Sequence, residues 1–229
     1  MDYFGPDIAA TYDNDPDVRF RPEHLALESG VLADLAGPGG RALELAIGTG
    51  RIAIPLRQRG VEVEGIDLSE AMLAQLNAKA PDIAATCGDY TSTVVAGEFD
   101  LVYLVFNTIG NVITQDGQVA TFVNAARHLR PGGTFLIETS VPQVRDRFRV
   151  FRHDEQGVGY DEYDTATQQM WSHHIRDGYR RSIPFRYTWP AELDLMARLA
   201  GLRLRERWAW WDRSSFTSSS TSHVSVWER

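Results

Sequence analysis

Short apolar segments alternate with segments of helical period between residues 41 and 140, and this alternation most constrains the fold. Strand character is predicted over 41–46, 61–67, 83–88, 98–106 and 133–139. Helical period is found over 51–59, 69–79 and 117–129, with Ser69 as an N-cap and the Pro131-Gly132-Gly133 triplet after the last helix. Regular strand–helix alternation is typical of βα units on a parallel sheet, so five parallel strands are expected.

The second half of the chain has a different pattern. Residues 158–187 are rich in Tyr, Thr, Trp and Arg with broken alternation, which predicts antiparallel strands inserted after the fifth strand. A helix over 191–199 ends at Gly201, and two strands over 202–211 and 222–229 follow it, joined by a Ser/Thr-rich loop. These late strands would close the sheet as an antiparallel hairpin. We therefore predict an α/β fold with a doubly wound, Rossmann-like sheet of about seven strands.

We expect one domain over residues 1–229. Its parts are an N-terminal lid or helical segment (1–40), a core (41–140), inserted strands (141–190) and a closing helix and hairpin (191–229). The formal net charge of −8 argues against nucleic acid as a partner, because binding phosphates requires clustered Lys and Arg. A basic run over 145–152 is interleaved with acidic and apolar residues, and we interpret it as solvated surface.

The cysteine content and the N-terminus indicate the cellular setting. A single cysteine, Cys87, cannot form an internal disulfide, and no Cys/His cluster has zinc spacing, so no metal site is expected. The N-terminus is acidic and lacks the basic flank and apolar core of a signal peptide. We expect a soluble, cytoplasmic protein without a membrane partner. No pattern indicates an oligomeric state.

Polar residues and glycines follow the predicted strands where a ligand would lie. In an open α/β sheet, ligands bind beyond the carboxyl ends of the strands, and Gly48 and Gly50 fall at the first of these ends. Asp67 ends the second strand, 17 positions after Gly50, near the spacing at which a carboxylate meets ribose hydroxyls. Asp89 and Asn107 follow the third and fourth strands. A nucleoside ligand is therefore favoured.

The charge of Glu44, on the first strand, separates two nucleoside cofactors. A dinucleotide would place its pyrophosphate near this carboxylate, which would repel it. Ala53 also stands where the dinucleotide fingerprint has its third glycine, although alanine is sometimes accepted there. S-adenosylmethionine carries an ammonium and a sulfonium instead, so Glu44 favours it. An NAD-linked oxidoreductase and a non-catalytic S-adenosylmethionine-binding partner protein remain the alternatives.

Four ordered motifs resemble those of the class I S-adenosylmethionine-dependent methyltransferases of the small-molecule type. They are LELAIGTGR, VEGIDLSEAML, ATCGDY and FDLVYLVFNTIGNV, followed by HLRPGGTFLIE, and the likeness is close over residues 41–140. Ala46 replaces the usual first glycine. The resemblance implies S-adenosylmethionine as cofactor, S-adenosylhomocysteine as product, and cofactor contacts from Tyr12, Glu44, Ala46, Gly48, Thr49, Gly50, Asp67, Leu68, Met72, Gly88, Asp89, Tyr90, Phe106 and Asn107.

Methyl transfer needs mainly orientation and exclusion of water, so a dedicated base is optional. The candidate catalytic residues are Asn107, His173 and His174; the two histidines would point to opposite faces of a strand. Further candidates for acceptor contact are Tyr160, Glu162 and Tyr163, with Asp161 a weaker one.

The acceptor is expected to be a small molecule methylated on nitrogen or oxygen. FNTIGN is somewhat similar to the corresponding loop of small-amine N-methyltransferases, including amino-sugar dimethylating enzymes, which favours nitrogen. The same loop lacks the prolines of the (N/D)PP(Y/F) motif carried by enzymes that methylate amino groups of DNA and tRNA.

Overall fold

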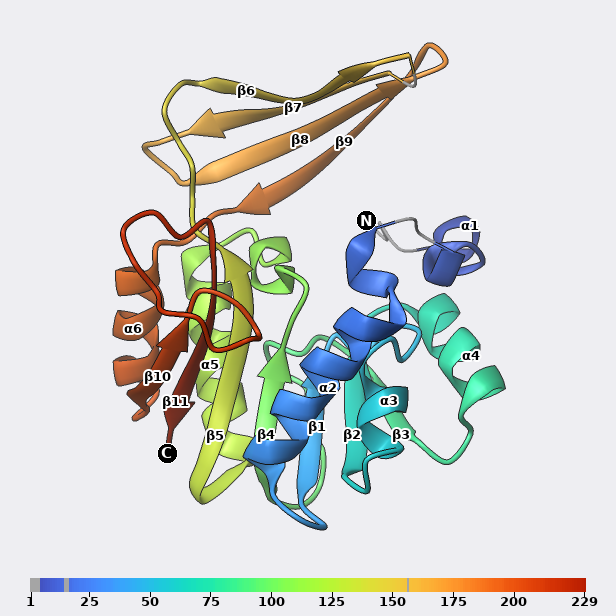
Figure 1. Ribbon diagram of the computed structural model, residues 1–229, viewed down its shortest axis with the longest axis vertical. Helices are drawn as coiled ribbons and strands as arrows, with labels where there is room; N and C mark the ends of the chain where they lie inside the picture. The colour runs from blue at the N-terminus through green and yellow to red at the C-terminus, as the bar shows by residue number, and fades with distance from the viewer. Residues whose placement is uncertain (1–4, 15–16, 156) are drawn as a thin grey trace.

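The computed structural model describes residues 5–14, 17–155 and 157–229. Its main sheet has seven strands in the order β3-β2-β1-β4-β5-β11-β10 (Figure 1). The first five strands pair in parallel, whereas β11 is antiparallel to β5 and β10 is antiparallel to β11. The predicted doubly wound sheet with an antiparallel C-terminal hairpin is confirmed. The strands are β1 (Arg41–Leu45), β2 (Glu62–Asp67), β3 (Ala84–Cys87), β4 (Phe99–Leu104), β5 (Leu129–Ser140), β10 (Arg203–Trp208) and β11 (Ser222–Glu228).

Helices cover both faces of this sheet. Alternation along β4 sends Leu101 and Tyr103 to the face packed by α2 and α3, and Val102 and Leu104 to the face packed by α5 and α6. Burial of the sheet on both faces explains the nearly continuous apolar sequence of β4. The helices are α1 (Pro6–Ala9), α2 (Pro22–Ala36), α3 (Ala53–Arg57), α4 (Glu70–Lys79), α5 (Gln115–His128) and α6 (Pro190–Leu199), with short 3-10 turns η1 (Tyr12–Asn14), η2 (Val18–Phe20) and η3 (Thr108–Asn111).

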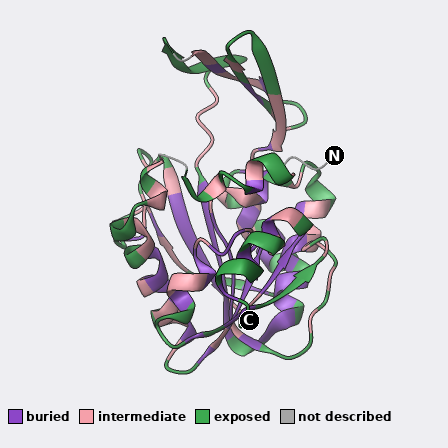
Figure 2. Ribbon diagram, turned by 90° about the vertical axis from the view of Figure 1, so that its right-hand side faces the viewer, coloured by how far each residue is buried: buried purple, intermediate pink, exposed green. Residues whose placement is uncertain are grey.

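A second, four-stranded antiparallel sheet is inserted between β5 and α6. Its order is β6-β7-β8-β9, formed by β6 (Phe148–Asp154), β7 (Gly157–Asp164), β8 (Gln169–Arg176) and β9 (Tyr179–Arg186). The inserted sheet stands beyond the carboxyl ends of the parallel strands (Figure 1). Most of its residues are exposed or half-buried, whereas strands β1, β2, β4, β5 and β11 of the main sheet are largely buried and its edge strands β3 and β10 are not (Figure 2). The basic run read as solvated surface lies largely on β6, which is exposed along its whole length.

One segment differs in detail from the prediction. The Pro131-Gly132-Gly133 triplet does not separate α5 from a later strand, because β5 begins directly at Leu129 and continues through it. Gly132 N–H donates to the Arg229 carbonyl and Arg229 N–H donates to the Gly133 carbonyl, so the C-terminal strand pairs with the triplet.

In the N-terminal segment, residues 1–4 and 15–16 lie outside the described residues. None of the helices among the described residues combines the length and apolar character that a membrane crossing requires.

Trp227 anchors the closing hairpin to the core, and its removal tests that packing. The side chain is fully buried, its ring packs edge-on against Phe122, and its indole N–H donates to Asp194 over 3.0 Å. Trp227→Ala should lower the free energy of unfolding by about 3–5 kcal/mol, as aromatic-to-alanine changes in cores do. Trp171→Ala, at a 42% exposed position, is the control. Equal losses in urea denaturation would contradict the placement of Trp227.

Candidate active site

The turn between β1 and α3 has an unusual backbone. Ala46, Gly48 and Gly50 all have positive φ, at 59°, 56° and 83°. A Cβ on Gly50 would lie 2.5 Å from Leu76 Cδ1, so only glycine fits there without rearrangement. Ala46 takes the same left-handed region despite its methyl group, which is a strained conformation for a non-glycine residue. The turn therefore brings the backbone N–H groups after β1 toward the end of β2.

Asp67 is fixed at the end of β2 by two backbone donors. Gly48 N–H donates to Oδ2 and Ser69 N–H donates to Oδ1, each over 2.8 Å. Ser69 in turn caps α4, as predicted, by accepting from the Met72 N–H over 3.3 Å. The Asp67 residue is only 9% exposed. Its carboxylate is thus oriented before any ligand arrives.

A cleft of about 510 Å³ opens at this edge of the sheet. Most of the predicted cofactor residues line it. These are Tyr12, Ala46, Gly48, Asp67, Leu68, Met72, Asp89, Tyr90, Phe106 and Asn107. Four of the predicted cofactor residues do not line it: Glu44, Thr49, Gly50 and Gly88.

Other residues line the cleft that the sequence did not single out. They are Arg19, Ser69, Thr91, Thr108, Asn111, Val112 and Phe185. Ser69, Thr91, Thr108, Asn111 and Val112 are close in sequence to predicted site residues, so the strand ends themselves were the available signal. Arg19 and Phe185 come from segments outside the four motifs, and no sequence pattern marked them.

Asn107 follows β4 in a left-handed conformation, with φ of 58°. Its Oδ1 accepts hydrogen bonds from the Thr139 hydroxyl and from the Ser140 N–H, the latter over 3.1 Å. Its Nδ2 donates no hydrogen bond to any residue that the structure describes. Because the oxygen is held by β5, the amide nitrogen is the group that Asn107 offers to a ligand.

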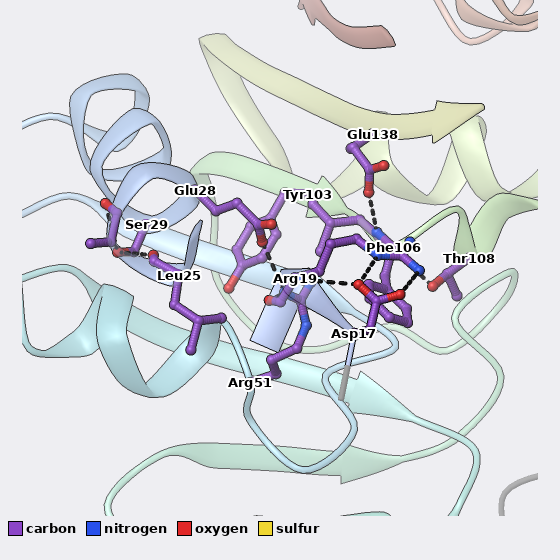
Figure 3. A network of polar contacts seen from close by, with 12 residues as sticks. Asp17, Arg19, Leu25, Glu28, Ser29, Arg51, Tyr103, Phe106, Thr108 and Glu138 are labelled. Atoms are coloured by element: carbon purple, nitrogen blue, oxygen red, sulfur yellow. Dashed lines mark hydrogen bonds and ion pairs between the residues drawn. The ribbon is translucent and has the colours of Figure 1, made fainter. Parts of the chain in front are cut away.

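A network of charged side chains lies around Phe106, which lines the cleft (Figure 3). The guanidinium groups of Arg19 and Arg51 lie 4.0 and 4.6 Å from the centre of the Phe106 ring. Arg51 forms an ion pair with Glu28 over 3.0 Å, and both side chains are less than 10% exposed. Arg19 is paired with Asp17 over 2.7 Å. These contacts hold η2 and its neighbours against a residue that lines the cleft.

Comparison with known proteins identifies the family. A family model described as a methyltransferase domain matches residues 42–133. The solved structure of the CcbJ methyltransferase from Streptomyces caelestis is 34% identical to this chain, covers 98% of it and 96% of that protein, and superposes with a TM-score of 0.85. The chain belongs to the class I S-adenosylmethionine-dependent methyltransferases.

Curated relatives of this methyltransferase support the same family. The cypemycin N-terminal methyltransferase of a Streptomyces species is 29% identical over 208 residues, which span 83% of this chain and 84% of that protein. A dTDP-3-amino-3,4,6-trideoxy-alpha-D-glucopyranose N,N-dimethyltransferase from Streptomyces venezuelae is 28% identical over 122 residues, 52% of each chain. The oxidoreductase and non-catalytic alternatives are not supported.

The side chains in the cleft of this methyltransferase suit S-adenosylmethionine better than a dinucleotide. Two carboxylates, Asp67 and Asp89, and one arginine, Arg19, are the charged groups among the described residues that line it. Carboxylates accept hydrogen bonds from ribose hydroxyls and an adenine amino group but repel a diphosphate. Within the described residues, no cluster of His, Cys, Asp and Glu side chains could hold a metal ion.

Glu44 is buried behind the cleft rather than exposed in it. It is 4% exposed, and the Tyr103 hydroxyl donates to its Oε2 over 2.8 Å. Burial raises the pKa of Glu44 to about 8, although the Tyr103 hydrogen bond and the Arg51 charge oppose this shift. An effect of Glu44 on a cationic cofactor therefore acts at a distance or through an intervening group, and it remains a prediction.

The two candidate histidines lie on β8 of the inserted sheet, and neither is among the residues that line the cleft. His173 is buried, with Nδ1 2.8 Å from the Ser182 hydroxyl. His174 is exposed, with Nε2 3.3 Å from the Ser172 hydroxyl. Of the three candidate catalytic residues, only Asn107 lines the cleft, and a catalytic role for either histidine remains a prediction.

Replacing Asp67 tests the ribose contact. Asp67→Asn should weaken S-adenosylhomocysteine binding by about 1–3 kcal/mol, because the charged acceptor for ligand hydroxyls is lost. Isothermal titration calorimetry measures this directly, and Asp82→Asn, at an exposed surface ion pair, is the control. Equal affinity of the two variants would rule out the assignment.

Replacing Glu44 tests its protonation state. Because burial raises its pKa from 4.5 to about 8, the folded chain holds a proton between these pH values that the unfolded chain has released. Through this group, stability falls as the pH rises across that window. Glu44→Gln lacks this contribution, so its free energy of unfolding should rise relative to wild type from about pH 5 to about pH 8. A difference between the two proteins that is independent of pH would show an ordinary pKa.

Proposed function

We propose that this methyltransferase transfers the methyl group to the amine nitrogen of a small molecule. The observation that carries the choice of nitrogen is the lining of the cleft beyond the residues assigned to adenosine, where Asn107, Asn111, Val112 and Phe185 lie. None of these side chains can take a proton near neutral pH, and the described residues that line the cleft include no histidine. A neutral amine needs no base to attack, whereas a hydroxyl usually does.

The names of the relatives agree with this proposal. One acts on the N-terminus of cypemycin, and another is an N,N-dimethyltransferase of an amino sugar. The FNTIGN loop is formed by Phe106 and Asn107 with the η3 turn, so the segment similar to small-amine enzymes lies beside the cleft. A small-molecule acceptor, the exclusion of nucleic acid and a cytoplasmic location are parts of the proposal.

Binding of the cofactor is assigned to the ends of the strands. Asp67 would accept hydrogen bonds from the ribose hydroxyls, and Asp89 would accept one from the adenine amino group. Arg19 is the cation in the cleft suited to the carboxylate of the methionine moiety. S-adenosylmethionine supplies a methyl group already activated by its sulfonium, so the chain itself has to bind, orient and desolvate.

The remaining groups orient the acceptor. Asn107 Nδ2 would hold a polar group of the substrate, since its Oδ1 is already engaged by β5. Phe106 and Phe185 would exclude water from the reacting atoms. Tyr12, on η1, packs edge-on against Phe20 at a ring separation of 5.4 Å, and this places an aromatic wall at the N-terminal side of the cleft. The proton of the methylated amine would leave to solvent after transfer.

A matched panel of acceptors tests the choice of nitrogen. Primary and secondary amines, each paired with the alcohol or phenol of the same skeleton, are incubated with S-adenosylmethionine, and the methylated product and S-adenosylhomocysteine are detected by mass spectrometry. Amines should be methylated, with rates that rise with pH as the free base forms. Methylation of the hydroxyl partners alone would contradict the proposal.

A further inference from the structure

The strand register of the inserted sheet divides its side chains into two faces. Phe185 of β9 lines the cofactor cleft. Residues paired with Phe185 on neighbouring strands share its face of the sheet, and so do residues two positions away along each strand. This set, the inner face, includes Phe185, Met170, Tyr163, Ile183, Ser172 and Asp161, and His174 lies on the same face further along β8. The other set, the outer face, includes Tyr160, Glu162, Trp171 and His173. Of the acceptor candidates on β7, Tyr163 and Asp161 therefore lie on the cleft side, and Tyr160 and Glu162 lie away from it.

The inner face is apolar where it meets the cleft. One cross-strand row consists of Tyr163, Met170 and Phe185. Ile183 occupies the next position of β9 on the same face. Met170, Phe185 and Ile183 are half-buried. Half-buried apolar side chains next to a cofactor cleft are typical of a surface that binds the carbon skeleton of a ligand.

A polar group begins one row further out, roughly 7 Å along the strands. Asp161 lies opposite Arg149 of β6 in the register, and the Tyr163 hydroxyl donates to Asp161 Oδ2 over 3.3 Å. Burial raises the pKa of Tyr163, and the nearby Arg149 guanidinium opposes this shift. A carboxylate beside a guanidinium offers both an acceptor and a donor, which is the combination that matches a hydroxyl group.

The base of the inserted sheet is fixed to the wall of the cleft. Gln118 of α5 donates to the carbonyl groups of Ile109 in η3 and Arg186 at the end of β9, over 3.1 and 3.2 Å. Arg186 donates back to Gln118 over 2.5 Å and forms an ion pair with Glu192 over 2.7 Å. Because this network is buried and its partners are satisfied, the inner face keeps one position relative to Asn107 and the rest of the cleft.

We propose that the inner face is the surface that determines acceptor specificity, and that Asp161 with Arg149 selects amines bearing a hydroxyl group beyond an apolar segment seated on Met170 and Phe185. The assignment rests on the proposed amine methylation. A hydroxylated amine fits this face, because the apolar row is continuous with the cofactor cleft and the polar row is complementary to a hydroxyl.

The test compares amines that differ by one hydroxyl. The pairs are 4-hydroxyphenethylamine with phenethylamine and trans-4-aminocyclohexanol with cyclohexylamine, and kcat/KM is measured from S-adenosylhomocysteine formation. Wild type should prefer the hydroxylated partner by roughly tenfold, as expected for one hydrogen bond to a charged group. Asp161→Asn should reduce the preference to within about twofold, because the amide no longer provides the charged acceptor.

Glu162→Gln is the matched control, since it changes the neighbouring carboxylate on the outer face and should leave the preference unchanged. S-adenosylhomocysteine affinity should be the same in all three proteins, which shows that each is folded. If Asp161→Asn does not fold, Met170→Trp gives a second measurement, since it should lower kcat/KM for the ring-bearing acceptors at unchanged S-adenosylhomocysteine affinity. Val150→Trp is its control, because Val150 lies opposite Tyr160 on the outer face and is 63% exposed.

The possible failures are distinguishable. Turnover of amines without a hydroxyl preference, or a preference that survives Asp161→Asn, overturns the specificity assignment and leaves amine methylation standing. Loss of preference in Glu162→Gln as well as Asp161→Asn also overturns it. Absence of turnover with every amine of both panels overturns the proposed function and this assignment together.

Discussion

The hydrogen bond from the Gly48 N–H to the Asp67 carboxylate joins the ends of two neighbouring strands, and the geometry of the cleft depends on it. It requires the chain to turn sharply after β1, which the positive φ angles of Ala46, Gly48 and Gly50 provide. It also requires β2 to end with its carboxylate facing that turn, which the parallel register of β1 and β2 provides. Without this turn and this register, the Asp67 carboxylate would not be oriented to accept hydrogen bonds from ligand hydroxyls in the cleft.

The sequence predicted the core because its signals are local. Ser69 caps α4 through a bond to Met72, and the apolar run of β4 reports burial on both faces. Ten of the predicted cofactor residues line the cleft because a parallel sheet brings the carboxyl ends of its strands to one edge. Glu44 does not line the cleft, because its side chain on a central strand is buried beside Tyr103. Its bond to Tyr103 involves a residue 59 positions away.

The inserted sheet was harder to predict, for a physical reason. Among the described residues it has no helical layer of its own, so both of its faces carry mixed side chains and alternation does not separate an inside from an outside. Only the register shows that Asp161 shares the side of Phe185 while Glu162 and His173 lie opposite. Arg19 likewise reaches the cleft through tertiary packing on Phe106, which no spacing in the chain reveals.

Both chain connections of the inserted sheet, before β6 and after β9, lie at its core side, whereas the β6–β7 and β8–β9 hairpins lie at the other end. Lengthening or shortening those distal hairpins therefore leaves every strand of the main sheet in place. Related enzymes with this architecture can therefore change the length of the inserted sheet in small steps and keep the same cofactor-binding residues. The range of accepted substrates can then change without a loss of stability in the main sheet and its helices.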